Sequence, residues 1–186
     1  MQCSGAGVSK KRNCFVTGQP GGGDVLSTGL LGICAPPARL LAMTSDDLPN
    51  AAPSPGVLEA AVYASDLDAA ESFYGGVLAL EKISRVGDRH VFFRVGPGVL
   101  LVFNPDETVK PPGNPDMPVP PHGSRGEGHV CLAMPGEALD DWRRRLGAAG
   151  VEIEADFIWP NGARSIYVRD PGNNSVELAE PRLWAG

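Results

Sequence analysis

The side chains that could bind a metal ion or move a proton are few in this chain of 186 residues, which has three histidines and four cysteines. Imidazole and carboxylate groups serve proteins as metal ligands and as general acids and bases. Glu59, His129 and Glu177 each lie in a short segment that reads as a strand. Successive side chains of a strand point to opposite faces, so each of the three lies opposite its branched apolar neighbours. We therefore expect all three to face a cleft over a packed core.

A tyrosine and a second histidine add candidate proton donors and acceptors. Tyr167 could donate a hydrogen bond to an oxyanion or act as a general acid, and ordinary packing between strands is the alternative. His90 shares a strand face with Phe92 and Arg94 and could serve as a base or contact substrate. A single histidine on a strand more often does neither. Tyr167 and His90 are the candidate catalytic residues.

The elements that would position these groups form a diverged repeat, in which each half reads as a strand, a helix and three further strands. Strands are expected at residues 57–64, 80–85, 90–95 and 99–103, and again at 129–134, 151–157, 163–169 and 175–179. A capping-box-like start at residues 65–68 opens the first expected helix, and the second covers residues 135–149. A half of this kind leaves one sheet face open, so two halves can pair and enclose a cleft.

A proline-rich segment separates the two halves. Residues 105–127 hold seven of the chain's 18 prolines, too many for a helix or a central strand. We expect this segment to link module one, residues 57–104, to module two, residues 128–181. The two modules and the linker would form one domain over residues 56–183.

The first 42 residues differ in composition from the rest. They hold three of the four cysteines, four of the sixteen basic residues and one of the 22 acidic residues. A glycine-rich stretch separates their basic and apolar parts, which is a poor spacing for a secretory signal. We expect residues 1–55 to be a disordered or non-native N-terminal extension.

The overall composition favours a globular protein and excludes some classes of partner. Hydrophobic residues make up 42% and charged residues 20% of the chain. The net charge of −6 disfavours nucleic acid, because phosphate binding uses clustered positive charge. No apolar run approaches the roughly 18 residues of a membrane span. We expect a cytoplasmic protein that binds a small-molecule substrate, without a nucleic-acid or membrane partner.

Several stretches of the repeat together match one known plan. They are Ser65-Asp66-Leu67 through Phe73-Tyr74, Gly128-His129-Val130, Ser165-Ile166-Tyr167-Val168-Arg169-Asp170-Pro171-Gly172-Asn173 and Val176-Glu177-Leu178. The chain thereby resembles the vicinal oxygen chelate (VOC) superfamily, which includes glyoxalase I, fosfomycin-resistance enzymes, extradiol dioxygenases and bleomycin-resistance proteins. The resemblance implies an α+β fold in which two βαβββ modules, the glyoxalase-like fold, form a cupped sheet cleft.

The resemblance also implies a metal site. In this superfamily the ligands lie on the first and last strands of the modules, which gives Glu59, His129 and Glu177 here; the fourth position falls near Leu101, which cannot bind a metal. One imidazole and two carboxylates can hold a divalent ion and leave positions open for water or substrate. Zinc, manganese, nickel, magnesium or iron would suit this set, with oxygen-activating iron weakly disfavoured. His122 could add a ligand, and a metal-free relative is the alternative.

Five residues are expected to bind substrate. Ser165 resembles a position that contacts substrate in the fosfomycin-resistance enzymes. Phe92 shares a strand face with His90 and could also contact substrate. Trp159 could wall an apolar pocket or take a core or lid role. Arg164 lies on the other face of its strand unless the strand start bulges. Cys131 would face the cleft as a reactive thiol or, more simply, as a small filler.

The function that the resemblance implies is that of a metal-dependent, glyoxalase-like enzyme. It would bind the vicinal oxygens of a small substrate at a divalent ion and carry out lyase, isomerase or transferase chemistry. A first alternative is a non-catalytic binding protein of the bleomycin-resistance type, which would use the same cleft. A dioxygenase is a second alternative, and it lacks the second histidine. Superfamily members build the site within one chain or across a homodimer, so both arrangements stay open.

Overall fold

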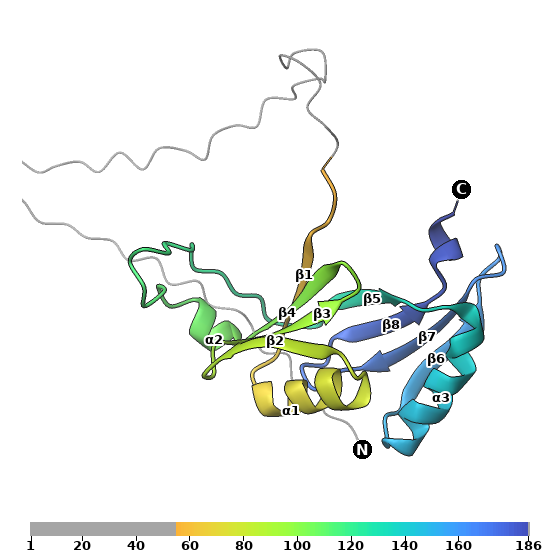
Figure 1. Cartoon of the computed structure of the whole chain (residues 1–186). Helices are drawn as coiled ribbons and strands as arrows, with labels where there is room; N and C mark the ends of the chain where they lie inside the picture. Colours follow the sequence, from red (N-terminus) through yellow and green to blue (C-terminus); the bar gives the residue numbers. More distant parts are fainter. Residues whose placement is uncertain (1–54, 186) are drawn as a thin grey trace, which may run out of the picture. The chain divides into compact units, whose positions relative to one another are not determined.

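The computed structural model describes residues 55–185. The predicted N-terminal extension therefore falls, except for its last residue, outside the described residues. The described part runs through the β-α-β-β-β order twice, with short helical turns added after each pass (Figure 1). Among these residues, no helix is both long enough and apolar enough to cross a membrane.

Eight strands form two four-stranded mixed sheets of the same design. The first sheet has the order β1-β4-β3-β2 and the second the order β5-β8-β7-β6. In both sheets the first strand of the module pairs in parallel with the last one, and the other pairs are antiparallel. The strands are β1 (Glu59–Tyr63), β2 (Glu81–Val86), β3 (His90–Val95), β4 (Gly98–Phe103), β5 (His129–Ala133), β6 (Ile153–Ile158), β7 (Arg164–Arg169) and β8 (Ser175–Ala179). This confirms the predicted α+β fold with two βαβββ modules.

Helical segments cover one face of each sheet and end each module (Figure 1). They are α1 (Leu67–Glu71), which continues as the π-helical η2 (Ser72–Val77), α2 (Pro105–Thr108), the 3₁₀ turn η3 (Gly136–Ala138), α3 (Leu139–Ala148) and the 3₁₀ turn η4 (Pro181–Trp184). The cap of α1 differs from the predicted capping box, because the Asp66 carboxylate accepts the bond from the Ala69 amide at 2.9 Å.

The proline-rich segment begins with one helical turn, α2, which its proline content did not predict. Proline is tolerated at the first position of a helix, where its missing N–H has no helical partner to lose. Asn104 caps this turn, because its side-chain oxygen accepts a bond from the Asp106 amide at 3.0 Å. The prediction that residues 105–127 contain no helix is therefore wrong for residues 105–108.

The core lies between the helices and one face of each sheet. In the first sheet the inward-facing side chains include Val91, Phe93 and Val102, which are buried. Ile166, Val168 and Leu178 are their buried counterparts in the second sheet. Because strand side chains alternate, the opposite face of each sheet is left to carry other residues. The candidate functional groups lie on these open faces.

Two polar contacts, one buried and one partly buried, join the modules. The Tyr74 hydroxyl donates to Asp170 Oδ2 at 2.7 Å, and Asn174 Nδ2 donates to the Tyr63 carbonyl at 2.9 Å. Burial, followed by the nearby Asp170 carboxylate, raises the pKa of Tyr74, so the phenol keeps its proton and remains a donor. A Cβ at Gly172 would lie 2.5 Å from the Tyr63 carbonyl, so the turn between β7 and β8 needs glycine there to approach module one.

Candidate metal and substrate site

Glu177 lies at the centre of the open face of the second sheet. It is flanked at the same register by Cys131 on β5 and Tyr167 on β7. His129 begins β5 and is placed on the same face by the period-two alternation. The same alternation in the sequence predicted this shared face.

Glu177 and His129 form a close pair. His129 Nε2 lies 3.5 Å from Glu177 Oε2. The Glu177 side chain is only 5% exposed, whereas that of His129 is 52% exposed. Two ligands that each lie about 2.1 Å from one ion are about 3.0–3.4 Å apart at angles of roughly 90–110°. The pair therefore has nearly the spacing of two neighbouring metal ligands.

A chain of two hydrogen bonds orients the Glu177 carboxylate. The Ser165 hydroxyl donates to Glu177 Oε1 at 2.5 Å, and Trp159 Nε1 donates to Ser165 Oγ at 2.8 Å. Ser165 itself is fully buried. It therefore contacts the carboxylate rather than an open pocket, so we assign it an orienting role in place of the predicted substrate contact. Hydrogen bonds of this kind fix the orientation of a carboxylate. Because Oε1 accepts the bond from Ser165, Oε2 is the oxygen that remains available to a metal ion.

The pair faces a hollow of about 500 Å³ on module two. The hollow combines a few polar groups with aromatic and apolar surface. Its lining residues are His129, Trp159, Pro160, Asn161, Tyr167, Glu177, Leu183 and Trp184. The structure thus brings together four of the predicted site residues, since His129, Glu177, Tyr167 and Trp159 share this hollow.

Two neighbours of Glu177 hold their protons at neutral pH. Burial, followed by the hydrogen bond to Glu177, raises the pKa of Tyr167 to about 12. Burial and the charge of Glu177 likewise raise the pKa of the Cys131 thiol to about 12. Tyr167 can therefore donate a hydrogen bond at neutral pH. Cys131 is a thiol rather than the nucleophilic thiolate, which favours the filler over the reactive group.

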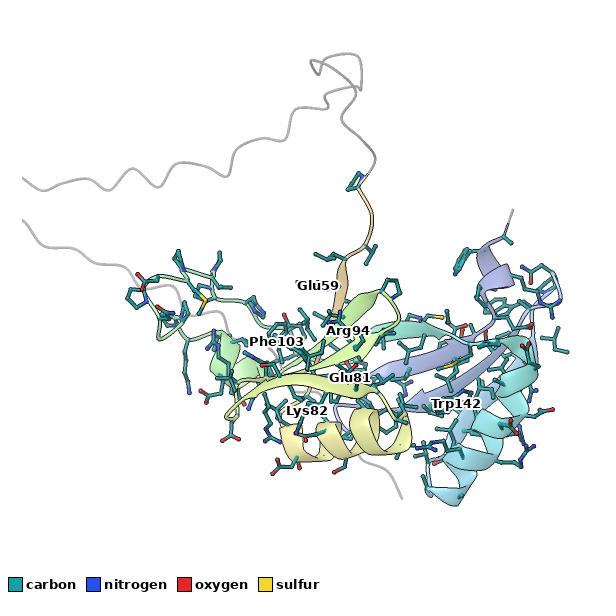
Figure 2. All side chains as sticks on the ribbon, viewed as in Figure 1. Glu59, Glu81, Lys82, Arg94, Phe103 and Trp142 are labelled. Atoms are coloured by element: carbon teal, nitrogen blue, oxygen red, sulfur yellow. The ribbon has the colours of Figure 1, made fainter. Side chains whose placement is uncertain are left out.

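Glu59 does not join this pair within one chain. It is exposed on β1, an edge strand of the first sheet (Figure 2), and it lines a groove of about 140 Å³ between β1, β4 and β5 that Cys131 also lines. Within residues 55–185, no three or more His, Cys, Asp and Glu side chains are grouped so that they could hold a metal ion. The predicted three-ligand set is therefore not assembled by a single chain.

His90, Phe92 and His122 belong to a separate aromatic cluster on the first sheet. The rings of His90 and Phe92 are stacked, with centroids 4.1 Å apart. His122 is hydrogen-bonded through Nδ1 to the Tyr63 hydroxyl at 2.9 Å. Partial burial, and then the charge of Arg89, lowers the pKa of His90, which is consistent with a neutral imidazole. None of the three lines the hollow of module two.

Arg164 points away from the hollow. Its guanidinium donates to Asp156 Oδ1 at 2.8 Å and to Asp140 Oδ1 of α3 at 2.7 Å. The strand alternation therefore holds at this end of β7, and the bulge that would have turned Arg164 toward the substrate is absent from it. We assign Arg164 a structural role between β6, β7 and α3.

Apart from Pro160, which follows Trp159 directly, three lining residues were not found from the sequence. Leu183 and Trp184 lie in η4, beyond the last strand of the repeat, where four residues give no usable periodicity. Asn161 lies in the turn between β6 and β7 and holds η4 in place, because its Nδ2 donates to the Leu183 carbonyl at 3.0 Å. The one sequence signal for this part of the lining was the apolar pair Leu183 and Trp184 after the final strand.

Comparison with known proteins agrees with the fold. The model of the Glyoxalase/Bleomycin resistance protein/Dioxygenase superfamily matches residues 56–178. A lactoylglutathione lyase from Agrobacterium tumefaciens is similar at 41% identity with a TM-score of 0.66, over 71% of this chain and 98% of that one. A glyoxalase/bleomycin resistance protein/dioxygenase from Nocardioides shares 21% identity over 70% and 85% of the two chains, with a TM-score of 0.55.

A more distant structure shares the fold alone. The fosfomycin resistance protein FosX from Listeria monocytogenes is 21% identical, covers 67% of this chain and 90% of its own, and has a TM-score of 0.50. No curated protein matches this chain.

Proposed function

This chain belongs to the glyoxalase/bleomycin resistance/dioxygenase superfamily, and we propose that it is one of the metal-dependent enzymes of that kind. It would bind vicinal oxygens of a small substrate at a divalent ion and carry out lyase, isomerase or transferase chemistry. The observation that carries this proposal is the pairing of His129 with a buried, oriented Glu177 on the wall of a hollow large enough for a small molecule.

The charge of Glu177 supports a cation at this place. A buried carboxylate is costly unless a positive charge or a metal compensates it. Within the described residues, the ion pairs give Glu177 no lysine or arginine, and His129 is the basic group beside it. Zinc, manganese, nickel, magnesium and iron all accept one imidazole and carboxylate oxygens. When bound, such an ion would polarise a substrate oxygen and stabilise negative charge that develops on it.

Tyr167 and Trp159 have separate tasks in this proposal. The protonated Tyr167 hydroxyl would donate a hydrogen bond to a substrate oxygen as that atom gains negative charge. Trp159 would present its ring to the substrate while its indole N–H holds Ser165. The Agrobacterium relative is named as a lyase, which fits the same coarse reaction class.

We further propose that Glu59 of a second copy supplies the third ligand. Glu59 is exposed on an edge strand, and its own chain leaves it apart from the His129–Glu177 pair. A homodimer with twofold symmetry would give each site one such group from the partner. This arrangement keeps the donor set predicted from the sequence.

Titration of the full-length protein with Mn²⁺ tests the proposal. His129→Ala and Glu177→Gln should each weaken Mn²⁺ binding by about 100-fold, because each removes a direct ligand. His122→Ala is the matched control, since that histidine bonds to Tyr63 on the other sheet, and it should bind Mn²⁺ like the wild type. Unchanged binding in both site variants would show that the ligands are wrong.

The same preparation separates the alternatives. A wild-type protein that binds no Mn²⁺, Zn²⁺, Ni²⁺, Mg²⁺ or Fe²⁺ and still binds small molecules in the hollow would be a non-catalytic binding protein. Consumption of dissolved oxygen during turnover would identify a dioxygenase instead.

A further inference from the structure

A nearly continuous aromatic wall borders the His129–Glu177 pair. The rings of Tyr167 and Phe157 are parallel within 2°, with centroids 5.9 Å apart. The next ring is Trp159, whose centroid lies 4.8 Å from that of Phe157. The flat faces of such side chains attract flat apolar groups, with ring centroids typically about 4.5–7 Å apart.

The rim of the hollow adds unpartnered apolar surface. Trp184 is 86% exposed, although tryptophan is among the residues that gain most from burial. Leu183 lines the hollow beside it. Exposed apolar surface that borders a concave site with a few convergent polar groups is typical of a small-molecule site.

Among residues 55–185, the lining offers an anionic ligand no permanently charged cationic side chain. Glu177 is its one acidic residue, and no lysine or arginine is among the lining residues. The arginines of β7 and η4 are held by carboxylates: Arg164 by Asp156, Arg169 by Glu154 and Arg182 by Glu180. A carboxylate or phosphate on the far end of a substrate would lose hydration in this hollow and find no cation in exchange.

We propose that the substrate is uncharged away from its oxygen pair and carries a flat apolar group, such as an aromatic ring, next to that pair. The ring would lie against Trp159 and Tyr167, with Trp184 closing over its outer edge. The oxygens would then meet the His129–Glu177 end of the hollow. The placement of the oxygens rests on the proposed function, whereas the ring end rests on the lining alone.

Three matched probes test the proposal by calorimetric titration of the full-length protein, with and without Mn²⁺. 2-Hydroxyacetophenone has adjacent hydroxyl and carbonyl oxygens beside a phenyl ring. Hydroxyacetone keeps the oxygens without the ring, and 4-(hydroxyacetyl)benzoate adds a carboxylate at the far side of the ring. We expect 2-hydroxyacetophenone to bind about tenfold tighter than hydroxyacetone, because the ring is buried. It should also bind about tenfold tighter than the benzoate.

Variants at one exposed position separate ring contact from charge. Trp184→Ala should weaken 2-hydroxyacetophenone about threefold, because it removes the outer apolar contact and leaves the core intact. Trp184→Arg should favour the benzoate about threefold relative to Trp184→Ala, because it adds a cation at the rim. Trp142→Phe is the control for a lost tryptophan, since Trp142 lies on α3 (Figure 2) and does not line the hollow.

Equal affinities for 2-hydroxyacetophenone and hydroxyacetone would overturn the ring assignment. Equal or tighter binding of the benzoate by the wild type would overturn the charge assignment. A ring preference in a protein that binds none of Mn²⁺, Zn²⁺, Ni²⁺, Mg²⁺ and Fe²⁺ would end the proposed function and leave this inference standing. Mn²⁺ binding without a ring preference would do the reverse.

Discussion

The open faces of the two sheets have the same register and opposite chemistry. Where module two has Glu177 on its last strand, module one has Leu101. Phe92 of β3 stands at the position of Tyr167 of β7. The backbone repeat therefore survives while the polar centre is present in one copy only.

The difference extends to the groups that support the carboxylate. Ser165, which donates to Glu177, has His90 as its counterpart in module one, and His90 is stacked on Phe92 instead. A buried carboxylate requires such donors, so Leu101 and the aromatic cluster belong together, as do Glu177 and Ser165. The comparison teaches that a buried carboxylate on this sheet face comes with the hydrogen-bond donor that supports it.

The largest expected effect comes from placing the carboxylate of module two into module one. Leu101 is 7% exposed, and the neighbours at its register are Ala61 and Phe92, which offer no side-chain hydrogen bond. Leu101→Glu should therefore lower the free energy of unfolding by about 3 kcal/mol, measured by urea unfolding. Leu101→Met keeps the volume and should cost less than about 1.5 kcal/mol. A glutamate variant as stable as the methionine variant would show that register alone suffices.

An intermediate effect is expected when the support of Glu177 is removed. Ser165→Ala deletes the bond to Oε1 and frees the Trp159 indole, so Mn²⁺ affinity should fall about tenfold. Ser165→Thr should restore most of it, because the hydroxyl is kept. Ser84→Ala, on β2 of the first sheet, is the control and should leave the affinity unchanged. An unchanged Mn²⁺ affinity in Ser165→Ala would show that Ser165 does not support metal binding.

The smallest effect concerns the covered faces, where ion pairs tie helix to sheet in both modules. The hydrogen bond from Arg164 holds the pKa of Asp156 below its usual range, and that from Lys82 does the same for Glu71. A carboxyl group whose pKa is lowered on folding stabilises the folded state at pH values above its unfolded pKa of about 4. This stabilisation is lost as the pH falls through the lower pKa of the folded state.

Asp156→Asn should therefore reduce the free energy of unfolding that is lost on acidification by about 1 kcal/mol. Glu71→Gln should reduce it by less, because Asp156 is the more buried of the two. Thermal unfolding between about pH 2 and 5 measures both. A larger effect of Glu71→Gln than of Asp156→Asn would contradict this ranking of the two ion pairs.

Much of the fold could be predicted because its local signals agree. The predicted bounds of the strands at 90–95 and 175–179 match β3 and β8, since alternation and flanking turn residues coincide there. Leu67, Ala70 and Tyr74 recur at helical spacing in the sequence and form a buried stripe along α1 and η2. The switch from α-helix to π-helix at Ser72 was not predicted, because the stripe positions do not distinguish the two.

The candidate site could be predicted only in part. Alternation places His129 and Glu177 on one face, because both lie on strands of one sheet. The position of Glu59 relative to them depends on how modules pack, within or between chains, and a strand pattern carries no information on that. The bond between Trp159 and Ser165 depends on the geometry of the turn after β6, and Trp184 follows the repeat altogether.

The central claim is that module two, and not module one, holds a metal ion between His129 and Glu177. Crystals grown with Mn²⁺ and measured near the manganese absorption edge test it most directly, because the anomalous signal locates the ion itself. The account predicts one peak per chain, within about 2.3 Å of both His129 Nε2 and Glu177 Oε2, with Glu59 of a second copy as the next ligand. A bound manganese that touches neither His129 nor Glu177 would contradict it.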